Sequence, residues 1–245
     1  IVGLANGDAR TAVNILESAT NSATKDEAGR LHIDAALVSE VAQRALRHDR
    51  AGAAHYDTIS AFIKSLRGSD PDAAVYWLAR MLEAGEDPLF IVRRMVILAA
   101  EDVGLADPQA LQMAVAAQQA VHFVGLPEGY LPMAEAAIYL AMAPKSNSAL
   151  RAYQAALADV RETRNDPVPL HLRNAVTGLM AREGYGRGYR YAHEHAGGWV
   201  KQQHLPDKLV DRRYYDPTDR GFEAAFRELL AQRRSDRAPD SGDNA

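Results

Sequence analysis

The sequence contains no cysteine, which excludes disulfide bridges and thiolate metal sites and fits a reducing, cytoplasmic environment. No apolar run approaches the twenty or so residues that a membrane span needs, and no signal-peptide pattern is present. We therefore expect neither a membrane partner nor secretion.

The usual residue patterns of a catalytic site are also missing. None of the five lysines (positions 25, 64, 145, 201 and 208) follows a glycine, as the lysine of a phosphate-binding P-loop must. The triplet His193-Glu194-His195, with His204 nearby, lacks the helical spacing of zinc enzymes, so no metal site is expected. The acidic pair at 101–102 has no accompanying nucleophile or base. We expect no enzymatic activity from this chain alone.

Composition is that of an ordinary globular protein, with 47% apolar and 24% charged residues. A formal net charge of −4 means that any contact with nucleic acid would need a local basic patch. The length of 245 residues allows one large domain or two smaller ones. Because the chain opens at Ile1-Val2 without methionine, we expect it to be part of a longer protein.

Apolar residues recur at helical spacing, and no stretch alternates over six or more residues, which predicts an all-α fold without a sheet. Aspartate followed by proline marks several helix starts, since aspartate caps the helix and proline suits its first position. These pairs lie at 70–71, 87–88, 107–108, 166–167 and 216–217. Helices are expected near 8–17, 33–48, 57–66, 71–84, 87–103, 108–124, 132–142, 147–163, 170–183 and 219–234.

The chain is organised around residues 56–85, which predict two helices joined by a tight corner. Gly68 is expected to end the first helix, and Ser69 or Asp70 to cap the second. Tyr76 and Trp77 stand side by side. We interpret both rings as core, with a protein contact as the alternative.

The helix that follows Pro88 is apolar on almost every side, which predicts burial inside the domain or between subunits. Arg93 and Arg94 lie within it, and Glu101 and Asp102 lie near its end, where carboxylates oppose the helix dipole. A structural ion-pair network is the preferred interpretation. Phosphate binding by the arginines is the alternative.

Residues 185–216 are rich in glycine, aromatic rings and arginine, and predict a long irregular segment. We interpret it as an arm that packs its rings on the domain or on a neighbouring subunit. The alternative is that it stacks bases and holds phosphates. Residues 235–245 lack apolar anchors and are expected to form a disordered tail.

Several stretches resemble the C-terminal portion of the RarA/MgsA family of AAA+ ATPases, the replication-associated recombination proteins related to clamp loaders. The resemblance runs from Gly7 to about Leu230. The matching stretches are GDARTAVNILE (7–17), YDTISAFIKSLRGSDPDAAVYWLARML (56–82), AAEDVGLADPQAL (99–111), YLAMAPKSN (139–147), VPLHLRNA (168–175), GYRYAHEHAGGWV (188–200) and LPDKLVDRRYYDPTDRG (205–221).

The resemblance implies that residues 1–50 end a helical lid and that residues 55–234 form a collar through which four subunits assemble. Arg10 occupies the position of the sensor-2 arginine, which reaches the phosphates of ATP in the whole protein; ATP and Mg²⁺ are implied only there. It also implies a DNA-dependent ATPase of stalled replication forks that is nucleoid-associated. DNA ends, single-stranded DNA and single-strand-binding protein are the implied partners.

A nucleic-acid-binding module is the alternative to an assembly domain. The residues expected to contact DNA, or a neighbouring subunit, are Arg93, Arg94, Lys145, Arg187, Arg190, Arg212 and Arg213.

Overall fold

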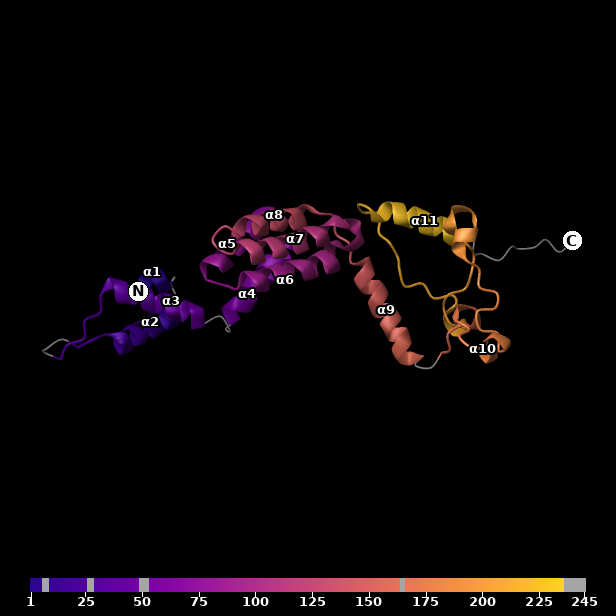
Figure 1. The fold of residues 1–245 in the computed structure, drawn as a ribbon. Helices are drawn as coiled ribbons and strands as arrows, with labels where there is room; N and C mark the ends of the chain where they lie inside the picture. Colours follow the sequence, from indigo (N-terminus) through magenta and orange to yellow (C-terminus); the bar gives the residue numbers. More distant parts are fainter. Residues whose placement is uncertain (6–8, 26–28, 49–52, 164–165, 236–245) are drawn as a thin grey trace. The chain divides into compact units, whose positions relative to one another are not determined.

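The computed structural model describes residues 1–5, 9–25, 29–48, 53–163 and 166–235, and these residues are helical or irregular, without a sheet (Figure 1). The predicted all-α class is confirmed. Two compact units can be distinguished. Unit 1 comprises residues 1–100 and 109–143, and unit 2 comprises residues 101–108 and the described residues from 144 onward.

Unit 1 opens with α1 (Val2–Ala5), α2 (Ala9–Ser22) and α3 (Ala35–His48). Helices α2 and α3 pack together, with Ile15 and Val41 among their buried residues. The Asp34 carboxylate accepts a hydrogen bond of 2.7 Å from the Leu37 amide and so caps α3. Both of the helices expected in this region are confirmed.

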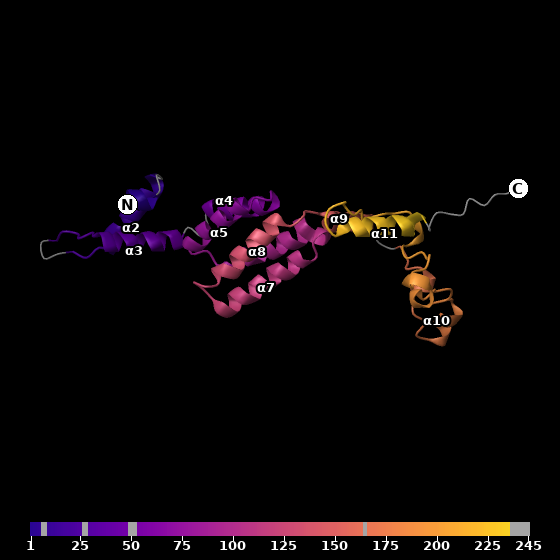
Figure 2. The same cartoon turned by 90° about the horizontal axis from the view of Figure 1, so that it is seen from above.

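The rest of unit 1 is a bundle of five helices, which we call the α4–α8 bundle. Its members are α4 (Ala53–Arg67), α5 (Pro71–Glu83), α6 (Pro88–Leu98), α7 (Gln109–Val124) and α8 (Tyr130–Met142). Figure 2 shows α8 between α5 and α7, and α8 contacts both. The core is apolar; its large, fully buried members include Phe62, Leu66, Ile91, Met95, Met133 and Leu140.

The corner between α4 and α5 was predicted well, with two corrections. Asp70 caps α5 by accepting from the Ala73 amide at 2.9 Å, and Asp87 caps α6 by accepting from the Leu89 amide at 3.0 Å. The residue with positive φ is Ser69, at 60°, rather than Gly68. The Tyr76 ring is 58% exposed, so the expectation that both neighbouring rings are core is wrong for Tyr76.

Helix α6 passes into a π-helical turn, Ala99–Val103, and a 3-10 turn, Gly104–Ala106. It is not buried on every side, because Arg93 and Ile97 are exposed and Arg94 is half-buried. The two arginines are therefore not buried inside the domain, and burial of this side of α6 between subunits stays a prediction. Arg93 lies on the side of α6 away from the buried residues Ile91, Val92 and Met95.

Unit 2 contains α9 (Ser148–Glu162), α10 (Gly178–Arg182) and α11 (Glu223–Ser235). The single helix expected over 170–183 is wrong: a 3-10 turn at Leu170–Leu172 is separated from α10 by non-helical residues. The helix expected from 219 begins at Glu223. The predicted tail lies outside the described residues, apart from Ser235, which ends α11.

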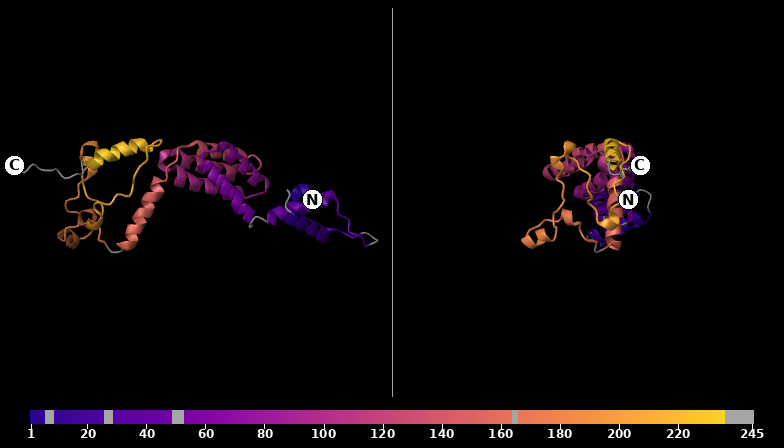
Figure 3. Two further views of the ribbon diagram at one scale, coloured as in Figure 1. Left: turned by 180° about the vertical axis from the view of Figure 1, so that it is seen from behind. Right: turned by 90° about the vertical axis from the view of Figure 1, so that its right-hand side faces the viewer.

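The irregular segment predicted over 185–216 is confirmed, and Figure 3 shows its winding path in two further views. Its only regular pieces are 3-10 turns at Ala192–Glu194, Ala196–Gly198 and Asp207–Leu209. Five residues beyond this segment, Gly221 has a φ of 52°, and a Cβ there would collide with the Ala106 carbonyl. The Phe222 amide donates to this carbonyl at 2.8 Å, so the close approach requires glycine.

No helix in the described ranges combines the length and the apolar character needed to cross a bilayer.

Candidate functional site

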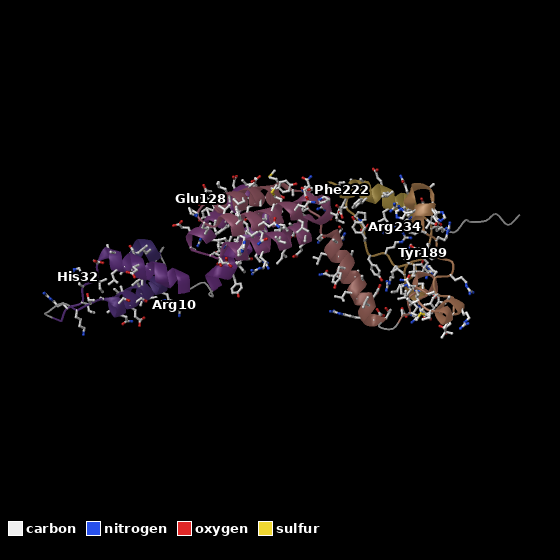
Figure 4. All side chains as sticks on the ribbon, in the orientation of Figure 1. Arg10, His32, Glu128, Tyr189, Phe222 and Arg234 are labelled. Atoms are coloured by element: carbon white, nitrogen blue, oxygen red, sulfur yellow. The ribbon has the colours of Figure 1, made fainter. Side chains whose placement is uncertain are left out.

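The residues predicted to matter in unit 1 lie on two separate elements. Arg10 is exposed on α2 and is labelled in Figure 4. Arg94 lines an open recess of about 370 Å³ between α4 and α6, together with Lys64 and Arg67. The remaining lining residues are Tyr56, Ile59, Ser60, Ile63 and Phe90. Arg93 does not line this recess.

Lys145, in unit 2, lies in a different environment from the other predicted cations. Burial lowers the pKa of its ammonium group, and the nearby Asp102 carboxylate opposes this shift. The Ser146 amide donates to the Asp102 carbonyl at 2.7 Å and holds the two segments together. This arrangement agrees with the expectation that Asp102 has a cationic neighbour. Lys145 therefore interacts with a carboxylate of its own unit.

Glu223, the first residue of α11, is fully buried and accepts five hydrogen bonds. Its Oε2 accepts from Ser146 Oγ at 2.6 Å and from the Thr218 amide and hydroxyl at 3.0 and 2.8 Å. Its Oε1 accepts from the Ser148 hydroxyl and, at 2.9 Å, from the Tyr215 hydroxyl. This carboxylate therefore ties α9, the end of the irregular segment and α11 together.

The hydrogen bonds to Glu223 change the acidity of the groups involved. Burial alone would raise the pKa of Glu223, but the hydrogen bonds from Ser146, Ser148 and Thr218 outweigh it and lower the pKa to about 2. Burial, together with the hydrogen bond to the charged carboxylate, raises the pKa of Tyr215 to about 12. The Glu223 carboxylate is thus charged, and the Tyr215 hydroxyl protonated, at neutral pH.

A second carboxylate, Asp159 on α9, anchors the irregular segment. Arg212 approaches it with Nε 3.0 Å from Oδ2 and donates from Nη2 to Oδ1 at 3.1 Å. Tyr214 donates its hydroxyl to Oδ2 at 2.9 Å, and burial followed by this carboxylate raises the pKa of Tyr214. The interpretation of 185–216 as an arm that packs its aromatic side chains on its own domain gains support from these contacts.

Two of the predicted cations, Arg212 and Arg213, line an open recess of about 680 Å³ in unit 2, which we call the basic recess. Lys201, His204 and Arg234 also line it, and Asp211 is its one acidic residue. Figure 4 shows Arg234 near the end of α11. The uncharged lining residues are Gln202, Gln203, Leu205, Val210, Tyr214 and Leu230.

Of the other predicted cations in the irregular segment, Arg190 lies beside the basic recess and Arg187 does not. Arg190 borders it, because its guanidinium donates to the Lys201 carbonyl at 3.3 Å and its amide donates to Gln202 Oε1 at 2.8 Å. Arg187 is exposed in a neighbouring turn and does not line the recess. The structure therefore brings together part of the predicted set, from Arg190 to Arg213, and leaves Arg93, Arg94, Lys145 and Arg187 outside it.

The sequence analysis did not detect that positive and negative charges are distributed differently between residues 1–143 and residues 144–235. Residues 144–235 contain 16 lysines and arginines against 11 acids, whereas residues 1–143 contain 11 against 18. The net charge of −4 conceals this difference, although a count by region would have revealed it. Sequence reasoning also missed Glu223 and Asp159, which look like ordinary helix acids until their distant partners are known.

Comparison with known families identifies first the class and then the family. Residues 1–67 match the model described as "AAA C-terminal domain", a description from the class of AAA proteins. Residues 68–234 match the model described as "MgsA AAA+ ATPase C terminal", and the chain belongs to this family. The two matches meet between residues 67 and 68, whereas the division at 50–55 expected from the sequence remains a prediction.

Individual relatives agree with this assignment. The chain is similar to replication-associated recombination protein A of Escherichia coli K12, with 48% identity over 94% of the chain and 52% of the relative. It is 51% identical to an AAA domain-containing protein of Mycobacterium tuberculosis, over 96% of the chain and 52% of that protein. Replication-associated recombination protein A of Bacillus subtilis is 44% identical, over 91% and 53%. The chain thus spans about half the length of these curated relatives.

Proposed function

We propose that this chain is the homotetramerisation region of a DNA-dependent AAA+ ATPase that acts in replication, recombination and repair at stalled forks. The observation that carries the proposal is the apolar surface of the α4–α8 bundle. Phe123 is 91% exposed, and Tyr56, Tyr76, Leu131 and Met142 are each more than half exposed. Exposed apolar side chains that gather into a large patch mark protein contacts, and we propose this role for the side chains of the bundle.

The same proposal assigns the remaining parts of the whole protein. ATP and Mg²⁺ would bind to an ATPase core supplied by the rest of the protein, and Arg10 would contact the phosphates as the sensor-2 residue. A guanidinium is suited to this task because its planar donors match phosphate oxygens. The match of residues 1–67 to an AAA domain and the exposed position of Arg10 on α2 support this assignment. Single-strand-binding protein and DNA ends are proposed partners of the whole protein.

Sedimentation of the 245-residue chain over a range of concentrations tests the proposed assembly. The expected species has the mass of four 26.7 kDa chains, about 107 kDa. A monomer at every concentration would overturn the assembly function for this chain.

A second candidate, binding of nucleic acid by unit 2, is favoured by the basic recess and by the excess of cations over residues 144–235. Phosphates of a single strand could contact Lys201 and Arg213, while exposed rings such as Tyr189 and Tyr191 stack on bases. Arg212 is already paired with Asp159 and is expected to contribute less.

Binding titrations with a labelled single-stranded oligonucleotide at several salt concentrations test this candidate. Arg213→Ala should weaken binding and lower the dependence of affinity on salt by about one phosphate contact. Arg227→Ala, an exposed arginine on α11 outside the basic recess, is the matched control. Binding that is absent at low salt, or equally weakened by both substitutions, would rule out the recess.

A further inference from the structure

The recess between α4 and α6, which we call the α4–α6 recess, is lined by positive charge alone. Its three cations are Lys64, Arg67 and Arg94, and none of the described residues that line it is acidic. They come from a part of the chain, residues 1–143, that holds 11 lysines and arginines against 18 acids. A recess with charge of one sign concentrates ions of the opposite sign. The α4–α6 recess therefore favours an anionic occupant.

The ends of the helices do not account for this cluster of cations. Lys64 and Arg67 lie in the last turn of α4, where the helix dipole favours positive charge. Arg94 lies before the last turn of α6, where the dipole gives no such preference. The three cations come together because α4 and α6 pack against each other.

The rest of the lining is apolar or aromatic. Ile59 and Ile63 are buried and Phe90 is half-buried, whereas the Tyr56 ring is 65% exposed. Aromatic faces stack on the flat ring of a nucleotide base. The half-buried Ser60 hydroxyl adds a neutral group that can donate or accept a hydrogen bond. The recess thus offers one ligand both a cationic part and an apolar part.

The volume and the walls of the α4–α6 recess suit a small molecule. Its volume of about 370 Å³ lies near the lower end of the range of roughly 300–1,000 Å³ found for ligand pockets. Every described lining residue belongs to α4 or α6. Side chains on packed helices are held more precisely than side chains on loops. A folded protein partner would need a much larger contact surface.

We propose that the α4–α6 recess binds a free nucleoside di- or triphosphate. The phosphates contact Lys64, Arg67 and Arg94, because guanidinium groups match phosphate oxygens and a polyphosphate balances several positive charges where a single carboxylate does not. The base stacks on the exposed Tyr56 ring. The inference concerns binding without hydrolysis, since no lysine of the chain follows a glycine as in a P-loop. It goes beyond the proposed assembly function and does not depend on it.

Calorimetric titration of the 245-residue chain with ADP, without Mg²⁺, tests the cationic part of the recess. Arg94→Ala and Lys64→Ala should each weaken ADP binding by about 10-fold or more, the effect of losing a hydrogen bond to a charged group. Arg93→Ala is the matched control, because Arg93 is the next residue along α6 but is exposed and outside the recess. Circular dichroism verifies that each variant is folded.

Titration with pyrophosphate tests the contact with the base. Pyrophosphate should bind about 10-fold more weakly than ADP, because it cannot stack on a ring. Tyr56→Ala should weaken the binding of ADP by a similar factor and leave the binding of pyrophosphate unchanged.

Loss of ADP affinity in the Arg94→Ala and Tyr56→Ala variants, with affinity retained in Arg93→Ala, supports the inference. No saturable binding of ADP at millimolar concentration, or equal losses in the two arginine variants, overturns the site. Pyrophosphate that binds as tightly as ADP overturns the nucleotide as its ligand. The mass of the assembled chain is measured separately, so failure of this inference leaves the proposed function standing.

Discussion

Units 1 and 2 are stabilised by different kinds of contact. The α4–α8 bundle of unit 1 buries large apolar side chains such as Phe62 and Met133. Every buried polar or charged residue found in the described part of the chain belongs to unit 2: Ser146, Ser148, Asp159 and Glu223. Apolar packing tolerates small shifts, whereas a buried carboxylate needs its donors in place. Unit 2 thus depends on a few specific hydrogen bonds.

The exposed surfaces of the two units also differ, one being more apolar and the other more polar. Unit 1 exposes apolar side chains on α7 and α8, such as Phe123, Leu131 and Met142, which suit contact with protein. Unit 2 exposes the basic recess, which suits contact with phosphate.

The largest expected effect comes from the core of unit 1. Phe62 is fully buried in α4, and Phe62→Ala should lower the free energy of unfolding by about 3–5 kcal/mol. Hydrogen exchange should accelerate in the α4–α8 bundle more than in unit 2. Tyr153→Ala, at a ring that is 68% exposed, is the control. Equal losses in the two variants would contradict the assignment of the core.

The second largest effect is a loss of stability confined to unit 2. Glu223→Gln replaces one accepting oxygen by a donating amide among five donors, and should cost roughly 3 kcal/mol in unit 2. Exchange should accelerate around α9 and α11 while the α4–α8 bundle stays protected. Glu228→Gln removes the same charge from an exposed position on α11 and should change little. Identical unfolding midpoints for the two variants would refute the role of Glu223.

The smallest of the three effects is the loss of stability of unit 2 at acidic pH. Because the pKa of Glu223 is lowered from 4.5 to about 2, its contribution is complete above pH 4.5 and is lost as the pH falls toward 2. The loss amounts to at most about 3 kcal/mol. Unit 2 should therefore open before the α4–α8 bundle during acid titration followed by hydrogen exchange. The Glu223→Gln variant should lack this part of the acid dependence.

Features set by adjacent residues were predictable from the sequence. The caps at Asp70 and Asp87 were found because a carboxylate and the amides that it binds lie within three residues of each other. The expected helix over 170–183 failed because residues 173–177 follow an irregular path that the apolar pattern did not reveal.

Features set by distant partners were not predictable. Ser146 and Glu223 are 77 residues apart in the sequence, and no pattern in the residues next to either one predicts their hydrogen bond. The basic recess likewise gathers Lys201, Arg213 and Arg234 from different parts of unit 2. The sequence analysis named Arg212 and Arg213 as contact residues but not Lys201 or Arg234, and a count of charges by region would have pointed to this part of the chain.

The central claim is that copies of this chain assemble through apolar surface. Light scattering on a sizing column at about 0.15 M and about 1 M salt tests it most directly, because salt screens charged contacts and leaves apolar ones intact. The account predicts four chains of 26.7 kDa, about 107 kDa, at both concentrations. A mass of 26.7 kDa at both, or assembly that disappears at high salt, would contradict it.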